Sequence, residues 1–122
     1  MQTFRIDVKP TGKPRMTRSD KWKQRPCVME YFRLKDTIRL EMKLKKIVPT
    51  GSIKLEFHMK PPESWSQKKK DSCIGLPHKQ KPDIDNCAKF VLDSVYDQDN
   101  IVYNLLAMKI WDTEDFIEVS FL

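Results

Sequence analysis

The sequence has little from which to build a disulfide framework, a metal ribbon or a membrane segment. Its 122 residues contain three cysteines, Cys27, Cys73 and Cys87, an odd number without any CxxC spacing. Such cysteines argue against a disulfide scaffold or a zinc ribbon and indicate a reduced, cytoplasmic setting. No apolar run approaches the roughly 18 residues that span a bilayer, and no signal peptide pattern opens the chain. We therefore expect a single cytoplasmic domain over residues 1–122, without membrane contact.

Charge is unevenly distributed along the chain. The total of 23 Lys and Arg against 17 Asp and Glu gives a net charge of +6, which favours an anionic partner, nucleic acid first. Residues 1–81 hold 21 of the basic and 8 of the acidic residues, whereas residues 82–122 hold 2 and 9. A nonspecific polyanion binder gains nothing from such an acidic final third, because carboxylates repel phosphates. We expect a bound cation between these carboxylates and the phosphates.

Hydrophobic periodicity predicts the secondary structure. Strands are predicted at 2–8, 52–59 and 116–122, where apolar and polar residues alternate, and at 101–111, an apolar run typical of a buried strand. Helical spacing of apolar residues predicts helices over 28–47 and 84–95. The proline-rich basic segments 9–26 and 60–82 are predicted to be loops. This order indicates an α+β domain in which a mixed β-sheet is covered by two helices.

Asp83 and Asp85 stand at the start of the second predicted helix, where an ordinary structural role explains them. Asp is a preferred N-cap, and acids in a first turn gain ~0.3–1 kcal/mol each from the helix macrodipole. Lys89 follows Asp85 at i+4 and Asp93 follows Lys89 at i+4, and such pairs contribute about 0.2–0.5 kcal/mol on an exposed helix.

A catalytic interpretation adds Asp97 and Asp99 of the turn YDQDN. The strand after this turn could run back beside the helix N-terminus, so that carboxylates from both segments converge. Two carboxylates ~4 Å apart repel by roughly 4 kcal/mol at an effective dielectric of about 20, unless one is protonated or a cation binds. Mg²⁺ suits such oxygen ligands and is often shared with substrate phosphates. It would polarise a scissile phosphate and help to deprotonate an attacking water.

The two basic loops provide the candidate DNA contacts. These are Lys13, Arg15 and Arg18 in the first loop and Lys68, Lys69 and Lys70 in the second. The first set favours phosphate binding over a chance solvated run, because glycine and proline hold like charges compactly. For the lysine run of the second loop the two interpretations are evenly balanced.

Three stretches resemble the RusA-type Holliday junction resolvases, which are small homodimeric endonucleases of bacteria and phages. KPDIDNCAK, residues 81–89, is similar to the signature D-[LI]-D-N-x-x-K of that family. YDQDN resembles its later acidic turn before an apolar strand, and GKPRMTR, residues 12–18, resembles its basic G-[KR]-P-R segment. The order and spacing of these stretches extend over nearly the whole chain.

This resemblance implies a RusA-like homodimer that uses Mg²⁺, with Mn²⁺ as the alternative, to resolve four-way DNA junctions by paired symmetric nicks in recombination or repair. It implies that Asp83, Asp85 and Asp99 are metal-binding catalytic acids and that Lys89 is the catalytic lysine. Family members often carry Asp-Asp where this chain has Gln98 and Asp99, so Asp97 remains an alternative ligand. The register of the next strand favours Asp99.

Two other functions stay open at the level of sequence. The chain could be a noncatalytic branched-DNA-binding accessory protein of replication or recombination, in which the acids only begin a helix. It could also be an interaction domain whose basic loops meet an acidic protein. Metal-dependent cleavage would distinguish a nuclease from the accessory protein. DNA binding that is absent or insensitive to salt would favour the interaction domain.

Overall fold

The computed structural model describes residues 1–14 and 26–122. Its elements are β1 (Gln2–Ile6), α1 (Pro26–Leu44), β2 (Ser52–Met59), α2 (Gln67–Cys73), α3 (Ile84–Val95), the 3₁₀ turn η2 (Asp99–Ile101), β3 (Asn104–Trp111) and β4 (Phe116–Phe121). The strands form one sheet in the order β1-β4-β2-β3. Strands β2 and β3 are parallel, whereas β4 is antiparallel to both β1 and β2. The predicted α+β fold with a mixed sheet is confirmed.

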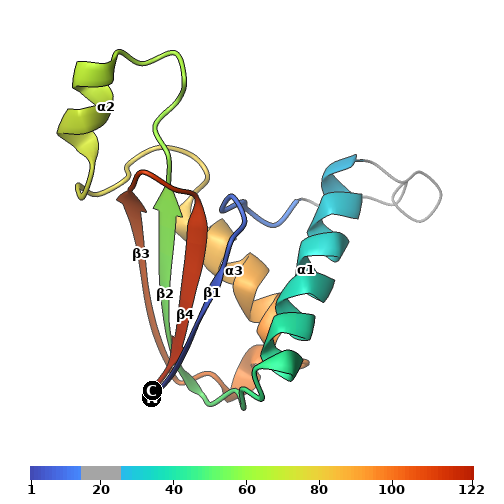
Figure 1. Cartoon of the computed structure of the whole chain (residues 1–122). Helices are drawn as coiled ribbons and strands as arrows, with labels where there is room; N and C mark the ends of the chain where they lie inside the picture. The colour runs from blue at the N-terminus through green and yellow to red at the C-terminus, as the bar shows by residue number, and fades with distance from the viewer. Residues whose placement is uncertain (15–25) are drawn as a thin grey trace.

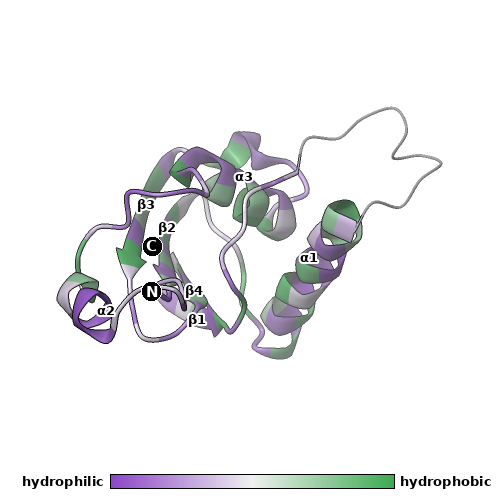
Figure 2. Ribbon diagram, turned by 90° about the horizontal axis from the view of Figure 1, so that it is seen from above, coloured by the Kyte–Doolittle hydropathy of each residue, from purple (hydrophilic) through white to green (hydrophobic). Residues whose placement is uncertain are grey.

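Helices α1 and α3 cover the same face of the sheet and lie side by side (Figures 1 and 2). Because β2 and β3 are parallel, their carboxyl ends lie at the same end of the sheet. Both covering helices begin at this end and run back along the strands (Figure 1). The acidic first turn of α3 therefore lies at the same end of the molecule as the segment that follows β1.

The core fills the space between the sheet and the two helices. Strand β2 alternates buried Ile53, Leu55 and Phe57 with partly exposed polar residues, so only one of its faces is dry. The helices contribute buried side chains at helical spacing, among them Tyr31, Leu34, Ile38 and Met42 of α1 and Cys87, Phe90 and Val91 of α3. Burial of this apolar stripe fixes which face of α3 is left for chemistry.

The prediction of loop throughout residues 60–82 is wrong, because the lysine run lies in α2. The hydroxyl of Ser66 accepts a hydrogen bond of 3.2 Å from the backbone N–H of Lys69 and so caps this helix. None of its residues is buried, so no hydrophobic periodicity marks it in the sequence. It is mainly hydrophilic and lies on the opposite side of the strands from α1 (Figure 2). No helix in residues 1–14 and 26–122 is long and apolar enough to cross a membrane.

The apolar run 101–111 was predicted to be a buried strand, and this is wrong for its first half. Strand β3 begins at Asn104 and forms an edge of the sheet, where Leu105 and Leu106 are 42% and 50% exposed. Its outer side is covered only near its end, where the backbone N–H groups of Gly75 and His78 donate to Trp111 and Lys109. An apolar run does not reveal whether a strand is central or at an edge.

Candidate active site and groove

Asp83 and Asp85 occupy the start of α3, and among the described residues neither caps the helix through its side chain nor pairs with a cation. Asp83 has the extended N-cap backbone, with φ −67° and ψ 145°, but its side chain makes no capping hydrogen bond. Asp85 lies in the first turn. Both residues are exposed, and within residues 1–14 and 26–122 neither forms an ion pair. The pair Asp85–Lys89 that an ordinary helix surface would explain is not formed.

The first turn of α3 is held in place from two directions. Lys109 of β3 donates to the carbonyl oxygens of Gln80 and Pro82, the second at 2.7 Å. From the other side, the backbone N–H of Lys13 donates to the carbonyl of Asn86 at 3.3 Å. A Cβ at Gly12 would lie 3.0 Å from Cβ of Asn86, a contact so tight that a larger residue would have to displace Asn86, so glycine favours this close approach. The basic segment after β1 is thereby docked on the acidic turn.

The thiol of Cys87 reports the electrostatics of this turn. Burial raises its pKa to about 11, Lys109 acts in the opposite direction, and the charges of Asp83 and Asp85 raise it further. Both carboxylates and the ammonium group thus lie within electrostatic range of the same buried atom. A thiol with such a pKa is protonated at neutral pH and serves as core, as its position on the apolar face predicts.

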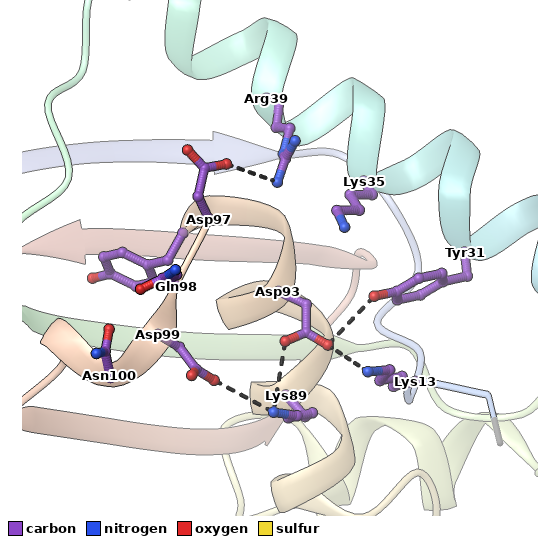
Figure 3. Close-up of a pocket in the computed structure, with 11 residues that line it drawn as sticks. Lys13, Tyr31, Lys35, Arg39, Lys89, Asp93, Asp97, Gln98, Asp99 and Asn100 are labelled. Carbon is purple, nitrogen blue, oxygen red and sulfur yellow. Dashed lines mark hydrogen bonds and ion pairs between the residues drawn. The ribbon is translucent and has the colours of Figure 1, made fainter. Parts of the chain in front are cut away.

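Lys89 lies one turn after Asp85 and is directed away from it. Its Nζ is 3.4 Å from Asp99 Oδ2 of η2 and 3.6 Å from Asp93 Oδ1 of α3 (Figure 3). The Lys89 side chain is half exposed, so it remains accessible while two carboxylates limit its position. The structure therefore brings together two of the predicted site residues, Lys89 and Asp99.

Asp93 is the most enclosed carboxylate at this site, with a side chain that is 18% exposed. Lys13 Nζ lies 2.7 Å from its Oδ2, and the Tyr31 hydroxyl donates to the same atom at 3.4 Å. Burial alone would raise the pKa of Asp93, but the hydrogen bond from Lys13 and the charges of Lys13 and Lys89 lower it overall. Burial and the Asp93 charge raise the pKa of Tyr31. Asp93 is consequently ionised and joins three segments of the chain.

These side chains line a groove of about 590 Å³ between α1 on one side and α3 and η2 on the other (Figure 3). Its lining is mostly polar, with cations and carboxylates from four segments of the chain. The lining residues are Lys13, Tyr31, Lys35, Arg39, Lys89, Asp93, Tyr96, Asp97, Gln98, Asp99 and Asn100. Such an open, charged groove suits a phosphodiester backbone better than an apolar small molecule.

The three acids that the family resemblance implies as metal ligands do not form one cluster. Asp83 and Asp85 are at the start of α3, whereas Asp99 follows its end and pairs with Lys89. In the part of the chain that the structure describes, no three His, Cys, Asp or Glu side chains are grouped to hold a metal ion. Asp97, the alternative ligand, is 96% exposed and lies 3.5 Å from Arg39. Asp83 and Asp85, two carboxylates without a cation partner in residues 1–14 and 26–122, do fit Mg²⁺, which takes one or two protein carboxylates and completes its shell with water and phosphate oxygens.

The predicted DNA contacts are divided between different places. Lys13 lines the groove, whereas Arg15 and Arg18 lie outside the described residues. Lys68, Lys69 and Lys70 lie on α2, on the other side of the strands from α1 (Figure 2). Lys69 Nζ is 4.0 Å from the centre of the Trp65 ring, and Lys70 lies 3.5 Å from Glu63. For these lysines, DNA binding stays a prediction.

Sequence reasoning missed the wall that α1 contributes to the groove. Tyr31, Lys35 and Arg39 follow one another at i+4, a spacing that places them on one face of a helix. It also treated Asp93 only as the partner of Lys89. The acid at i+4 from Lys89 was the available signal, but its contacts with Lys13 and Tyr31 are made across 80 and 62 residues of chain.

A comparison with protein families identifies the family of the chain. The family model described as Endodeoxyribonuclease RusA matches residues 6–121, which is nearly the whole chain. No curated protein and no solved structure gave a significant match. The match includes the segment before α1, the first turn of α3, Lys89 and the acidic turn. The chain belongs to the RusA endodeoxyribonuclease family.

Proposed function

We propose that this protein is a metal-dependent, structure-selective endodeoxyribonuclease that resolves four-way junctions by paired nicks. Family membership implies an endonuclease that resolves Holliday junctions. The observation that supports the mechanism is that Asp83 and Asp85, one turn before a half-exposed lysine, have no cation partner in the part of the chain that the structure describes. Exposed carboxylates without cations in a chain of net charge +6 are suited to receive one.

Asp83 and Asp85 would hold Mg²⁺, or Mn²⁺ in its place, and Asp99 or Asp97 would be a further ligand. A bound ion of this kind would polarise the scissile phosphate and lower the pKa of an attacking water. The remaining work falls to groups of the chain itself. Lys109 and the backbone of Lys13 fix the turn that carries the two acids. The carboxylates that would bind the metal are therefore kept close to their productive positions.

Lys89 would stabilise the negative charge that develops on the phosphate. Its Nζ is held by Asp93 and Asp99, so its position is established before substrate binds. Preorganised charges of this kind contribute most when they need no rearrangement during the reaction. Asp93 would act as a positioning residue, because it contacts Lys89 and Lys13 but lies deeper than both.

Two nicks in one junction require two sites, which a two-fold homodimer provides. Each protomer would cut one of two opposing strands. The natural setting of such an activity is recombination or repair, including the processing of phage DNA.

The test is a cleavage assay on a synthetic four-way junction and on a linear duplex of matched sequence, with Mg²⁺, Mn²⁺ or EDTA. Wild type and Asp85→Asn are compared in parallel. We expect symmetric nicks in the junction only, with metal and wild type only. Asp85→Asn should still bind the junction, because it loses a repelling charge and keeps the basic groove. A variant that cleaves as well as wild type would falsify the role of Asp85.

A noncatalytic junction-binding protein is the second candidate. Two observations favour it: Asp99 is separated from Asp83 and Asp85, and Asp99 is paired with Lys89. Binding without cleavage, over several junction sequences and with either metal, would support this second function. Size-exclusion chromatography with light scattering then decides whether the binding species is a dimer.

A further inference from the structure

Helix α1 forms one wall of the groove with a single face. Tyr31, Lys35 and Arg39 line the groove from three successive turns (Figure 3). Residues four apart on a helix have Cβ atoms about 5–6 Å apart, which is comparable with the spacing of neighbouring phosphates along a strand. The two cations of this wall are therefore arranged along the groove.

Charges are sorted around α1. Its acids Glu30, Asp36 and Glu41 do not line the groove. Two of them neutralise nearby cations, because Arg33 of the same helix pairs with Glu30 at 2.5 Å and Lys45, the residue after the helix, pairs with Glu41 at 3.2 Å. Arg33 and Lys45, which lie outside the groove, are thus balanced locally, and α1 places no acid in the groove lining to balance the cations there.

Arg39 is anchored but keeps donors available. Its Nε donates to the carbonyl of Ser94 at 3.0 Å, which fixes the guanidinium at the end of α3. Its contact with Asp97 is long, at 3.5 Å, and Asp97 is almost fully exposed, so this pair contributes little. A guanidinium has five N–H donors, and most of them remain for a ligand. Lys35 Nζ lies 6.0 Å from the centre of the Tyr31 ring and forms no ion pair within the described ranges.

The opposite wall is electrostatically different. There Lys13 and Lys89 are already contacted by Asp93 and Asp99. On the α1 side a polyanion would find Lys35, which has no carboxylate partner within the described residues, and Arg39, whose carboxylate contact is with the almost fully exposed Asp97. Because the half-exposed Lys89 lies in the same groove, an anion bound along α1 would continue directly from the position of a phosphate at Lys89.

We propose that Lys35 and Arg39 bind the phosphate backbone of the DNA strand beside the cleavage position. This inference rests on the proposed function, since it takes DNA as the anion. The contact is made to phosphates and carries no sequence information. It should therefore strengthen binding to junction and duplex alike, through release of counterions.

The experiment measures binding of fluorescent four-way junction and duplex by anisotropy, in EDTA, over a series of salt concentrations. The groove variant is Lys35→Gln with Arg39→Gln. The matched control is Arg33→Gln with Lys45→Gln, which removes the same number of charges outside the groove, one from α1 and one from the residue after it. For the groove variant, the slope of log K against log salt should become shallower by about 2, because each lost phosphate contact contributes about 0.9. The control should keep the wild-type slope.

Three results would overturn the inference. If the groove variant and wild type gave equal slopes, Lys35 and Arg39 would make no phosphate contact. If both proteins still cleaved the junction, the proposed function would remain intact. If the groove variant and the control reduced the slope equally, the effect would be due to the net charge of the protein. Absence of DNA binding by wild type would remove the proposed function as well. Thermal melting checks folding, and Lys35→Gln alone serves if loss of the Arg39–Ser94 bond unfolds the double variant, with an expected slope change of about 0.9.

Discussion

Helix α3 carries carboxylates near both of its ends, but in opposite electrostatic settings. At its start, Asp83 and Asp85 are exposed and have no cation partner within the described residues. Toward its end and in the turn that follows, Asp93, Asp97 and Asp99 each contact a lysine or arginine. The first group is available for an added cation, whereas Asp93 and Asp99 of the second group hold lysines of the chain in position. Acidic residues that look alike in sequence thus fall into two roles.

The largest effect should come from Lys89, which lies between the two groups. Lys89→Met keeps much of the side-chain length and removes the charge. We expect the rate of junction cleavage in single turnover to fall by about 10²–10³-fold, as when one preorganised donor to a developing anion is removed. Junction affinity in EDTA should change far less. If cleavage stayed within a few fold of wild type, Lys89 would belong only to the ion pairs of the second group.

A medium effect should come from Asp93, and it should appear in stability. Asp93→Asn removes the charge that Lys13 and Lys89 contact. We expect a loss of about 1 kcal/mol in the free energy of unfolding near neutral pH, between the values for exposed ion pairs and for hydrogen bonds to charged groups. Urea unfolding of wild type and variant measures this difference. Asp36→Asn is the matched control, since Asp36 is an exposed acid of α1 outside the groove.

The pH dependence of this difference has a defined sign. The folded state lowers the pKa of Asp93, so its stabilising contribution is present above the unfolded value of about 3.9 and is lost as pH falls through the lower folded value. The gap between wild type and Asp93→Asn should therefore narrow in acid. A gap that widened as the pH fell would contradict the assigned ionisation.

The sequence was sufficient for the elements whose apolar residues are periodic. The alternation in β2 and the helical stripe of α3 both correspond to buried faces, because burial of apolar area is what such patterns record. Helix α2 buries nothing, and the exposure of β3 depends on its place in the sheet. Local periodicity therefore predicts neither the presence of α2 nor the exposure of β3.

For the site, sequence placed single residues but not their partners. It located Asp83, Asp85 and Lys89 by motif and spacing. It did not show that Lys89 contacts Asp99 and Asp93 rather than Asp85. It also did not show that Lys13 reaches across to Asp93. Those contacts depend on how α1, α3 and the segment after β1 pack, which is a property of the tertiary structure.

The smallest effect should be that of Asp83→Ala on stability, and it decides how the first group is understood. A capping Asp that is replaced by Ala costs about 0.5–2 kcal/mol. Asp83 makes no side-chain capping bond, so only its interaction with the helix macrodipole is lost, at the low end of ~0.3–1 kcal/mol for an exposed charge. We expect a loss near that lower value in urea unfolding, together with loss of metal-dependent cleavage. A loss approaching 2 kcal/mol would show that the side chain caps α3 in solution, and the contrast between the two ends of the helix would then disappear. A small stability loss with cleavage abolished would assign Asp83 to the metal and not to the fold.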